Sequence, residues 1–194
     1  MKTPLSIQYN EKESPTCYTA PAIFLHWLGA VLIVAGFILG LIMTDIPGLT
    51  PTKLKYFSWH KWIGVTAFLS VVPRIVWRLT HTVPALPKEM GRMHQYAAHL
   101  AHLALYGLLI AVPISGLLYS QAAGVAVVYF GVINIPTVLA PDPQWKVILK
   151  TVHWILNYLL FSLVALHVLA ALKHQFIQRD NLLARMLPFL QRNP

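Results

Sequence analysis

This sequence of 194 residues contains few charged residues, which make up only 11% of it. Globular proteins carry about 25% charged residues. Acidic residues are the scarcest, with six Asp and Glu against fifteen Lys and Arg, for a formal net charge of +9. Hydrophobic residues make up 57% of the chain, and the mean hydropathy is +0.60. This composition argues against a disordered chain, a collagen and a soluble enzyme.

Cysteine is nearly absent as well, since Cys17 is the only one. An internal disulfide and a cysteine-based metal site are therefore excluded. The first twenty residues are polar and lack the apolar core of a cleavable signal peptide. Nearly all basic residues fall outside the long apolar runs instead of gathering on one soluble face, which argues against nucleic acid as a partner.

Four long apolar runs dominate what is present. They cover about residues 22–43, 59–78, 97–120 and 147–176. Each can form a membrane-spanning helix, which needs about 20 residues. The sequence therefore predicts an all-α fold: a transmembrane four-helix bundle forming a single domain over residues 1–194. Between the last two helices, the apolar stretch 125–130 is too short to span and is predicted to lie at the membrane interface.

The basic residues predict the orientation of this bundle. One side carries ten of them: Lys2, Lys12, Arg74, Arg78, Lys88, Arg92, Lys173, Arg179, Arg185 and Arg192. The other side carries five: Lys53, Lys55, Lys61, Lys146 and Lys150. Cytoplasmic loops of membrane proteins are enriched in Lys and Arg, so both termini are predicted to be cytoplasmic.

Nine histidines are unusual in so apolar a chain, and four of them fall at two depths. His26 lies near the inner end of the first helix and His60 near the outer end of the second. The fourth helix carries His153 near its outer end and His167 fourteen residues later. Fourteen residues rise about 21 Å and return to within about 40° of the same face. Depth therefore pairs His60 with His153 outside, and His26 with His167 inside.

Two imidazoles meeting across a helix bundle suit axial ligation of a b-type haem. The sequence thus predicts two haem b groups, with His60 and His153 as iron ligands of one and His26 and His167 of the other. The alternative is that each histidine packs or anchors at the interface, but that reading does not predict two depth-matched pairs. A zinc or other iron shell is disfavoured because no cysteine and almost no carboxylate lies at membrane depth.

Other polar residues gather at the predicted inner level. Arg74 follows His60 by fourteen residues and Arg78 comes one turn later; they could neutralise haem propionates, or simply snorkel to the interface. His174 follows His167 by seven residues and could donate to a quinone carbonyl, or be solvated at the interface. His99 and His102 could support propionates or quinone, or serve as interfacial anchors.

The order and spacing of several motifs resemble those of a known family over about residues 23–187. The motifs are Leu25-His26-Trp27-Leu28, Trp59-His60-Lys61-Trp62-Ile63-Gly64, Pro73-Arg74, Trp77-Arg78-Leu79, His99-Leu100-Ala101-His102-Leu103, Tyr106, Phe130-Gly131, Ile135-Pro136, His153-Trp154, Leu166-His167, His174 and Asp180-Asn181-Leu182-Leu183-Ala184-Arg185-Met186. The chain resembles the bacterial cytochrome b561 family, which comprises four-helix di-haem b cytochromes of the inner membrane.

The resemblance implies the same four haem ligands and places His174 at an inner quinone site. It also implies a basic residue at that site from the loop between the second and third helices, where Lys88 and Arg92 are the candidates. Members of this type resemble superoxide:ubiquinone oxidoreductases. Outer basic residues suit such an activity because a cluster of one sign focuses an anion, although it could equally dock an acidic electron-transfer protein. The five are Lys53, Lys55, Lys61, Lys146 and Lys150.

The function expected from the sequence is transfer of electrons from superoxide outside to ubiquinone near the cytoplasmic side, in a lipid bilayer. Iron with two imidazole ligands has no open position, so outer-sphere transfer is expected. One alternative is a cytochrome b subunit that exchanges electrons between quinone and a partner dehydrogenase or hydrogenase. Another is a structural or haem-sensing membrane protein. His81 and His94 receive no role.

Overall fold

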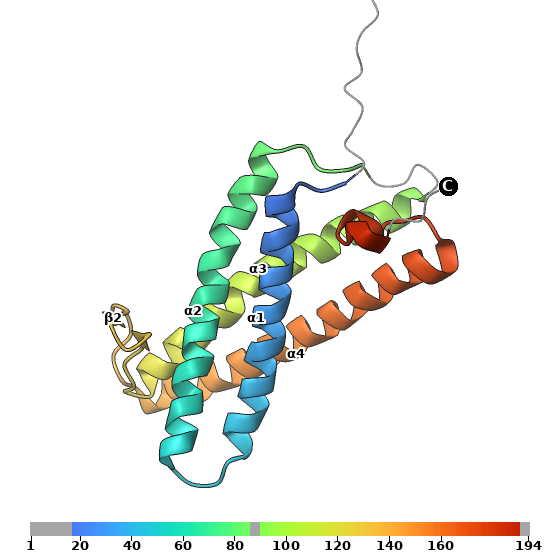
Figure 1. Cartoon of the computed structure of the whole chain (residues 1–194). Helices are drawn as coiled ribbons and strands as arrows, with labels where there is room; N and C mark the ends of the chain where they lie inside the picture. The colour runs from blue at the N-terminus through green and yellow to red at the C-terminus, as the bar shows by residue number, and fades with distance from the viewer. Residues whose placement is uncertain (1–16, 86–89, 191–194) are drawn as a thin grey trace, which may run out of the picture.

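The computed structural model describes residues 17–85 and 90–190, and four long helices dominate it (Figure 1). Their bounds are α1 (Ala20–Asp45), α2 (Pro51–Thr80), α3 (Arg92–Ala122) and α4 (Pro143–Lys173). All four, with α4 counted through Gln178, are long and apolar enough to cross a membrane. The prediction of a mostly helical chain with four such helices is confirmed.

The helices run past the apolar stretches because polar caps start two of them. The Thr50 hydroxyl accepts a hydrogen bond from the Lys53 amide, so α2 begins at Pro51 instead of near residue 59. The Asp142 carboxylate accepts from the amides of Gln144 and Trp145, so α4 begins at Pro143. A side-chain acceptor followed by proline is a strong helix start, and a hydropathy pattern does not register it.

Apolar side chains face outward over much of the molecule. Phe24, Leu41 and Leu103 are 65%, 71% and 69% exposed, respectively. Such a surface is disfavoured in water and suits contact with lipid. Among the described residues, no large side chain is fully buried, so the interior is a shallow seam between helices.

The helices pack as two antiparallel hairpins that are inclined to one another (Figure 1). α1 packs along α2, α3 packs along α4, and the hairpins meet most closely where α2 contacts α3. Glycines let side chains of α2 approach α1: an added Cβ at Gly36 would lie 3.6 Å from Ile63, and one at Gly40 would lie 3.5 Å from His60. The seam between the hairpins is where side chains from all four helices can meet.

The connection from α3 to α4 forms a short hairpin of its own. Strands β1 (Val128–Tyr129) and β2 (Ile133–Asn134) pair antiparallel. The indole nitrogen of Trp62 donates to the Val128 carbonyl at 2.8 Å, which fixes this hairpin against α2. The stretch predicted to lie at the interface is thus partly a strand held against the bundle.

The opposite end of the molecule is closed by the C-terminal segment. After α4 the chain makes a π-helical turn (His174–Gln178) and two 3₁₀ turns (Leu183–Arg185 and Pro188–Leu190). The Trp27 indole donates to the Met186 carbonyl at 3.0 Å, and the Tyr18 amide donates to the Arg185 carbonyl at 3.4 Å. The two ends of the described chain therefore lie at the same end of the bundle.

Replacing Gln121 should loosen the outer connection. Its side chain is 3% exposed, donates to the Pro136 carbonyl at 2.9 Å and accepts from the amides of Val138 and Leu139. Gln121→Leu leaves these backbone groups without partners, which costs about 1–3 kcal/mol. We expect a lower thermal unfolding midpoint in detergent and faster proteolysis within residues 123–142. The exposed Gln144→Leu is the matched control; equal behaviour of the two variants would contradict the assigned role.

Candidate functional site

At the end of the bundle that the sequence predicts to be outer, His60 of α2 faces His153 of α4 across the seam. Their ring centroids are 6.4 Å apart, and the rings are nearly perpendicular. Nδ1 of His60 lies 3.0 Å from the Gly36 carbonyl oxygen, and Nδ1 of His153 lies 3.2 Å from the Val112 carbonyl oxygen. A carbonyl can only accept, so both Nδ1 atoms carry the proton when they make these bonds. Each Nε2 then keeps a free lone pair, which is the arrangement of metal-binding imidazoles.

At the inner end, His167 of α4 has two histidine neighbours. The His26 ring centroid lies 6.3 Å away, and that of His102 on α3 lies 5.5 Å away. Nη2 of Arg74 lies 3.0 Å from Nδ1 of His26, and its guanidinium lies over the Tyr106 ring at 5.2 Å. Sequence reasoning assigned His102 to propionate or quinone, and did not foresee its contact with His167.

The spacing of both pairs fits a metal ion between two imidazoles. A metal–imidazole bond is about 2.0–2.1 Å long, and a ring centre lies about 1.1 Å beyond its nitrogen, so the centroids should be about 6.3 Å apart. In the outer pair, the contacts of both Nδ1 atoms with backbone carbonyl oxygens are compatible with metal binding through Nε2. The inner pair fits by distance, but a guanidinium only donates, so it places the His26 proton on Nε2. Ligation by that nitrogen requires Arg74 to turn away from Nδ1.

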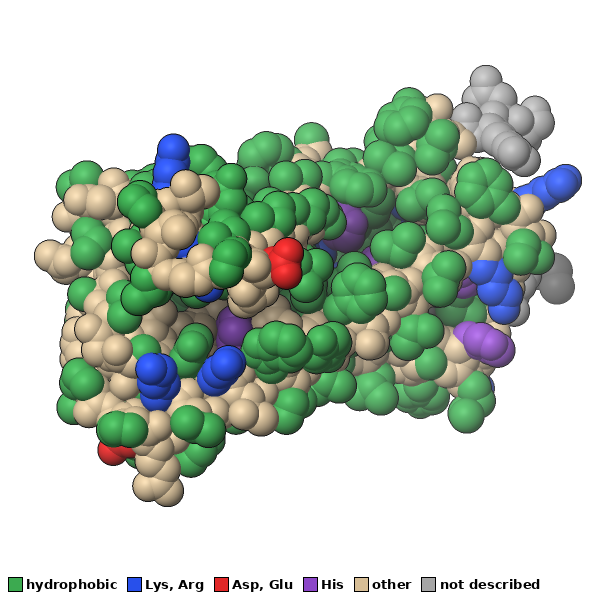
Figure 2. All heavy atoms as spheres, turned by 90° about the horizontal axis from the view of Figure 1, so that it is seen from below, with side chains coloured by type: hydrophobic (Ala, Val, Ile, Leu, Met, Phe, Trp, Pro, Cys, Tyr) green, Lys and Arg blue, Asp and Glu red, His purple; other side chains and the backbone are tan. Residues whose placement is uncertain are grey.

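A cavity of about 970 Å³, part of it open to the surroundings, separates the hairpins at the outer pair. Its lining is mostly apolar and comes from all four helices; it includes His60, His153, Lys61 and Asn157. Figure 2 shows a histidine lying in a hollow of a largely apolar face, with basic side chains beside it.

The profile of prokaryotic cytochrome b561 matches residues 17–189. The chain belongs to this family. It is 34% identical to "Cytochrome b561 homolog 2" of Escherichia coli K12 over 174 residues, which cover 90% of this chain and 93% of that one. It is 29% identical over 175 residues to "Probable superoxide oxidase CybB" of Yersinia pestis, with 88% and 96% covered. "Cytochrome b561 homolog 1" of E. coli K12 is 25% identical over 171 residues, with 88% and 97% covered.

As a member of the cytochrome b561 family, the protein is a membrane electron-transfer protein. The family implies haem b as its cofactor. Within the described residues, no cluster of three or more His, Cys, Asp or Glu is arranged to hold a bare metal ion. The histidine pairs across the seam are thus the arrangement that fits a haem iron with two protein ligands.

A second cavity of about 460 Å³ lies at the inner end of this cytochrome. Arg74, Arg78 and Tyr106 line it together with Met186 of the C-terminal segment. Both arginines thus reach the same space beside the inner histidines. Guanidinium groups bind carboxylates through paired hydrogen bonds, so this cavity could receive haem propionates.

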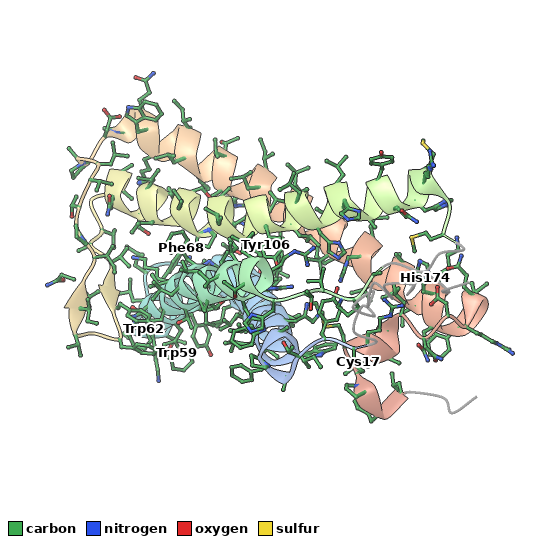
Figure 3. All side chains as sticks on the ribbon, turned by 90° about the horizontal axis from the view of Figure 1, so that it is seen from above. Cys17, Trp59, Trp62, Phe68, Tyr106 and His174 are labelled. Carbon is green, nitrogen blue, oxygen red and sulfur yellow. The ribbon has the colours of Figure 1, made fainter. Side chains whose placement is uncertain are left out.

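The remaining inner residues of the sequence prediction are more scattered. His99 is exposed and its Nδ1 donates to the Gln95 carbonyl of its own helix at 2.7 Å. Arg92 is exposed at the first position of α3. Lys88 lies outside the described residues. His174 lies at the opposite end of the molecule from Trp59 and Trp62 (Figure 3) and contacts Asp180.

The five outer lysines have different surroundings. Lys61 lines the outer cavity next to His60. Lys146 and Lys150 are exposed on the first turns of α4. Lys53 donates to the Ile46 carbonyl at 2.6 Å, and Lys55 lies over the Trp59 ring at 4.8 Å. Lys53 therefore also holds the turn between α1 and α2, a role that sequence spacing did not suggest.

Gly116 of α3 is a site residue that sequence reasoning missed. A Cβ there would lie 2.9 Å from Cε1 of His153, which is too close for any real contact. The Ser115 hydroxyl lies 2.9 Å from Nδ1 of the same ring. Their signal in the sequence is a pair of small residues just after the helix proline, Pro113. Together they seat the His153 imidazole against α3.

Gly116→Ala should displace His153 and reduce haem binding. The added methyl cannot be accommodated unless the ring gives up its bonds to Val112 or Ser115. We expect up to half of the haem b per chain to be lost, measured by haem extraction and absorbance. Gly107→Ala is the matched control on the same helix, because nothing lies within 4 Å of its Cβ position. Full haem content in both variants would refute the seating role.

Proposed function

We propose that this protein is a di-haem b cytochrome that oxidises superoxide at its outer end and reduces ubiquinone at its inner end. The observation that carries the proposal is the presence of two histidine pairs, with centroids 6.4 and 6.3 Å apart, at two depths of one bundle. His153 and His167 of α4 supply one imidazole to each pair, about 21 Å apart along the helix.

The proposed roles follow from the contacts of each side chain. His60 and His153 hold the outer haem, with both Nδ1 protons kept on backbone carbonyls. His26 and His167 hold the inner haem, and Arg74 and Arg78 neutralise its propionates in the inner cavity. Bound haem would supply one-electron redox chemistry at the level of each histidine pair. The arrangement needs no open iron position, since electrons and not oxygen atoms are transferred.

We infer that both termini are cytoplasmic and that the membrane is the bacterial inner membrane. The inference rests on the ratio of ten to five basic residues between the two ends and on the positive-inside rule. The two ends of the described chain lie together, so both are inferred to lie on the same side of the membrane. The outer histidine pair then faces the periplasm, and the protons that ubiquinone needs come from the cytoplasm.

Superoxide is the proposed electron donor because the outer cavity combines a half-buried imidazole pair with the Lys61 ammonium. A positive site with apolar walls attracts a small anion and raises its encounter rate. The Yersinia pestis relative, 29% identical, is named a probable superoxide oxidase. Each superoxide loses one electron and becomes dioxygen; two such electrons and two protons convert one ubiquinone to ubiquinol. His174 is the proposed quinone contact, together with a basic residue that precedes or begins α3, for which Lys88 and Arg92 are the candidates.

Single histidine substitutions should separate the two haems. His60→Ala and His167→Ala should each lose about one of two haems, because one imidazole alone holds iron weakly. His26→Ala should match His167→Ala, whereas His102→Ala should keep both haems. Haem per chain and the redox titration of the absorbance bands measure this. If His102→Ala loses a haem and His26→Ala does not, the inner pairing is overturned.

Removing outer positive charge should slow the reaction with superoxide. The test is a triple variant that carries Lys61→Gln, Lys146→Gln and Lys150→Gln. It keeps Lys53, because that side chain holds the α1–α2 turn. The rate of haem reduction by superoxide should fall about tenfold at low ionic strength and lose much of its salt dependence. Lys173→Gln, which removes a charge at the other end, is the control. An unchanged rate in the triple variant would rule out electrostatic steering.

Stopped-flow mixing of superoxide with the quinone-loaded protein tests the whole proposal. Reduction of haem followed by its reoxidation by ubiquinone supports it. Haem that ubiquinol reduces but superoxide does not would instead favour a cytochrome b subunit serving a partner dehydrogenase. Haem that neither reactant reduces would favour a structural or sensing role.

A further inference from the structure

The end of α4 departs from regular helix where His174 begins. A π-helical turn covers His174–Gln178, and π-turns occur often at functional sites. The backbone then takes positive φ at two residues that are not glycine, 56° at Arg179 and 59° at Asn181. Left-handed backbone is unfavourable for a residue with a side chain, and such strain often marks a functional position. Asp180 lies between these two residues.

Both carboxylate oxygens of Asp180 have defined partners. Nδ1 of His174 donates to Oδ2, and the Leu182 amide donates to Oδ1 at 3.1 Å. The Asp180 amide also donates to the His174 carbonyl at 3.4 Å. The turn therefore folds back so that the carboxylate meets the imidazole from the side of Nδ1. Nε2 is left for another partner.

The charge distribution makes this contact distinctive. It is the one contact within 4 Å between a basic and an acidic side chain among residues 17–85 and 90–190. The described part of the chain holds three carboxylates, of which Asp142 caps α4 and Asp45 ends α1, both at the outer end. Among the described residues, Asp180 is thus the one carboxylate at the inner end. It contacts a histidine although arginines lie close in the sequence.

A second unusual group adjoins the pair. Gln175 is 5% exposed, and its Oε1 has no hydrogen-bond partner. A buried amide oxygen without a partner is costly, and a ligand that can donate a hydrogen bond would satisfy it. A hydroxyl of a quinol is a donor of this kind. Gln175 directly follows His174 in the π-helical turn, so the end of α4 carries both the His174–Asp180 contact and an unsatisfied amide oxygen.

We propose that Asp180 is a positioning residue that makes His174 the proton donor to the bound quinone. The inference rests on the proposed function and specifies the proton path at its inner site. The carboxylate keeps the first proton on Nδ1 and orients the ring, so a second proton taken from cytoplasmic water binds Nε2. Nε2–H then gives its proton to the nearer carbonyl oxygen as the quinone takes up electrons.

The reaction balances with reactants already named. One ubiquinone takes two electrons, supplied by two superoxide ions, and two protons. The proton from Nε2 forms the O–H bond at one oxygen, and His174 recovers a proton from cytoplasmic water. The other oxygen takes its proton from water directly. Asp180 keeps its charge throughout, so it acts through His174 and does not itself exchange a proton with the quinone.

Asp180→Asn separates this role from a structural one. The amide oxygen can still accept from the Leu182 amide, while the NH₂ group replaces the oxygen that faces Nδ1. The histidine is then forced to carry its proton on Nε2 and loses the stabilising charge. Asp180→Ala removes both contacts and reports the structural cost. Asp180→Glu restores a carboxylate.

The assay uses haem-loaded protein in liposomes, reduced with superoxide and mixed with decylubiquinone. We expect Asp180→Asn to slow haem reoxidation at saturating quinone by about tenfold or more. This is less than the roughly 10²–10⁴-fold that a proton donor itself contributes, because Asp180 acts through His174. The KM for decylubiquinone, the haem content and the rate of haem reduction by superoxide should stay within about twofold. Asp180→Glu should recover part of the rate.

A direct measurement of the imidazole complements the kinetics. Nitrogen-15 spectra of histidine-labelled protein should show the His174 proton on Nδ1, and its shift to Nε2 in Asp180→Asn. His174→Gln identifies the signal. Wild-type rates in Asp180→Asn, or an unchanged histidine signal, would overturn the positioning role alone. Failure of decylubiquinone to reoxidise the wild-type haem would instead overturn the proposed function, and the proton path with it.

Discussion

The rest of the structure depends on placing imidazoles in a medium that offers their nitrogens no water. A buried ring nitrogen without a partner costs folding free energy. Each Nδ1 atom therefore needs a hydrogen-bond partner, and each Nε2 atom must face the group that it is to bind. At the outer level, the carbonyl oxygens of Gly36 and Val112 contact the Nδ1 atoms of His60 and His153, respectively. These carbonyls come from α1 and α3, so the pair on α2 and α4 needs all four helices.

The two ends of the bundle differ in a way that suits two kinds of reaction. The outer end has carbonyl-bonded histidines, a largely apolar cavity and a small hairpin fixed by Trp62. The proposed loss of an electron by superoxide releases no proton, and the described residues of this end place the Lys61 ammonium beside the histidine pair. The inner end is crowded with Arg74, His102 and the His174–Asp180 pair. Reduction of a quinone requires protons, and these polar contacts are of the kind that supplies them.

Hydropathy was enough to predict the four helices, because each apolar run is far longer than a soluble helix needs. It misplaced the starts of α2 and α4, where Thr50 and Asp142 cap polar turns. Helical spacing brought His153 and His167 to one face, since fourteen residues nearly complete a whole number of turns. It could not rank His102 against His26 as the neighbour of His167, because that depends on how α3 and α1 are rotated. Ligation by these residues stays a prediction.

The sequence by itself predicted the membrane helices and the family. It also set the place of each histidine along its helix, because the rise per residue is fixed by the backbone. Only the tertiary structure decided which side chains share a space. The contact between Gly116 and His153, the Gln121 bonds to the outer connection and the turn that brings Asp180 onto His174 all join groups whose directions no periodicity sets. Direction depends on the inclination of the two hairpins and on strained turns, and these arise from packing of the whole chain.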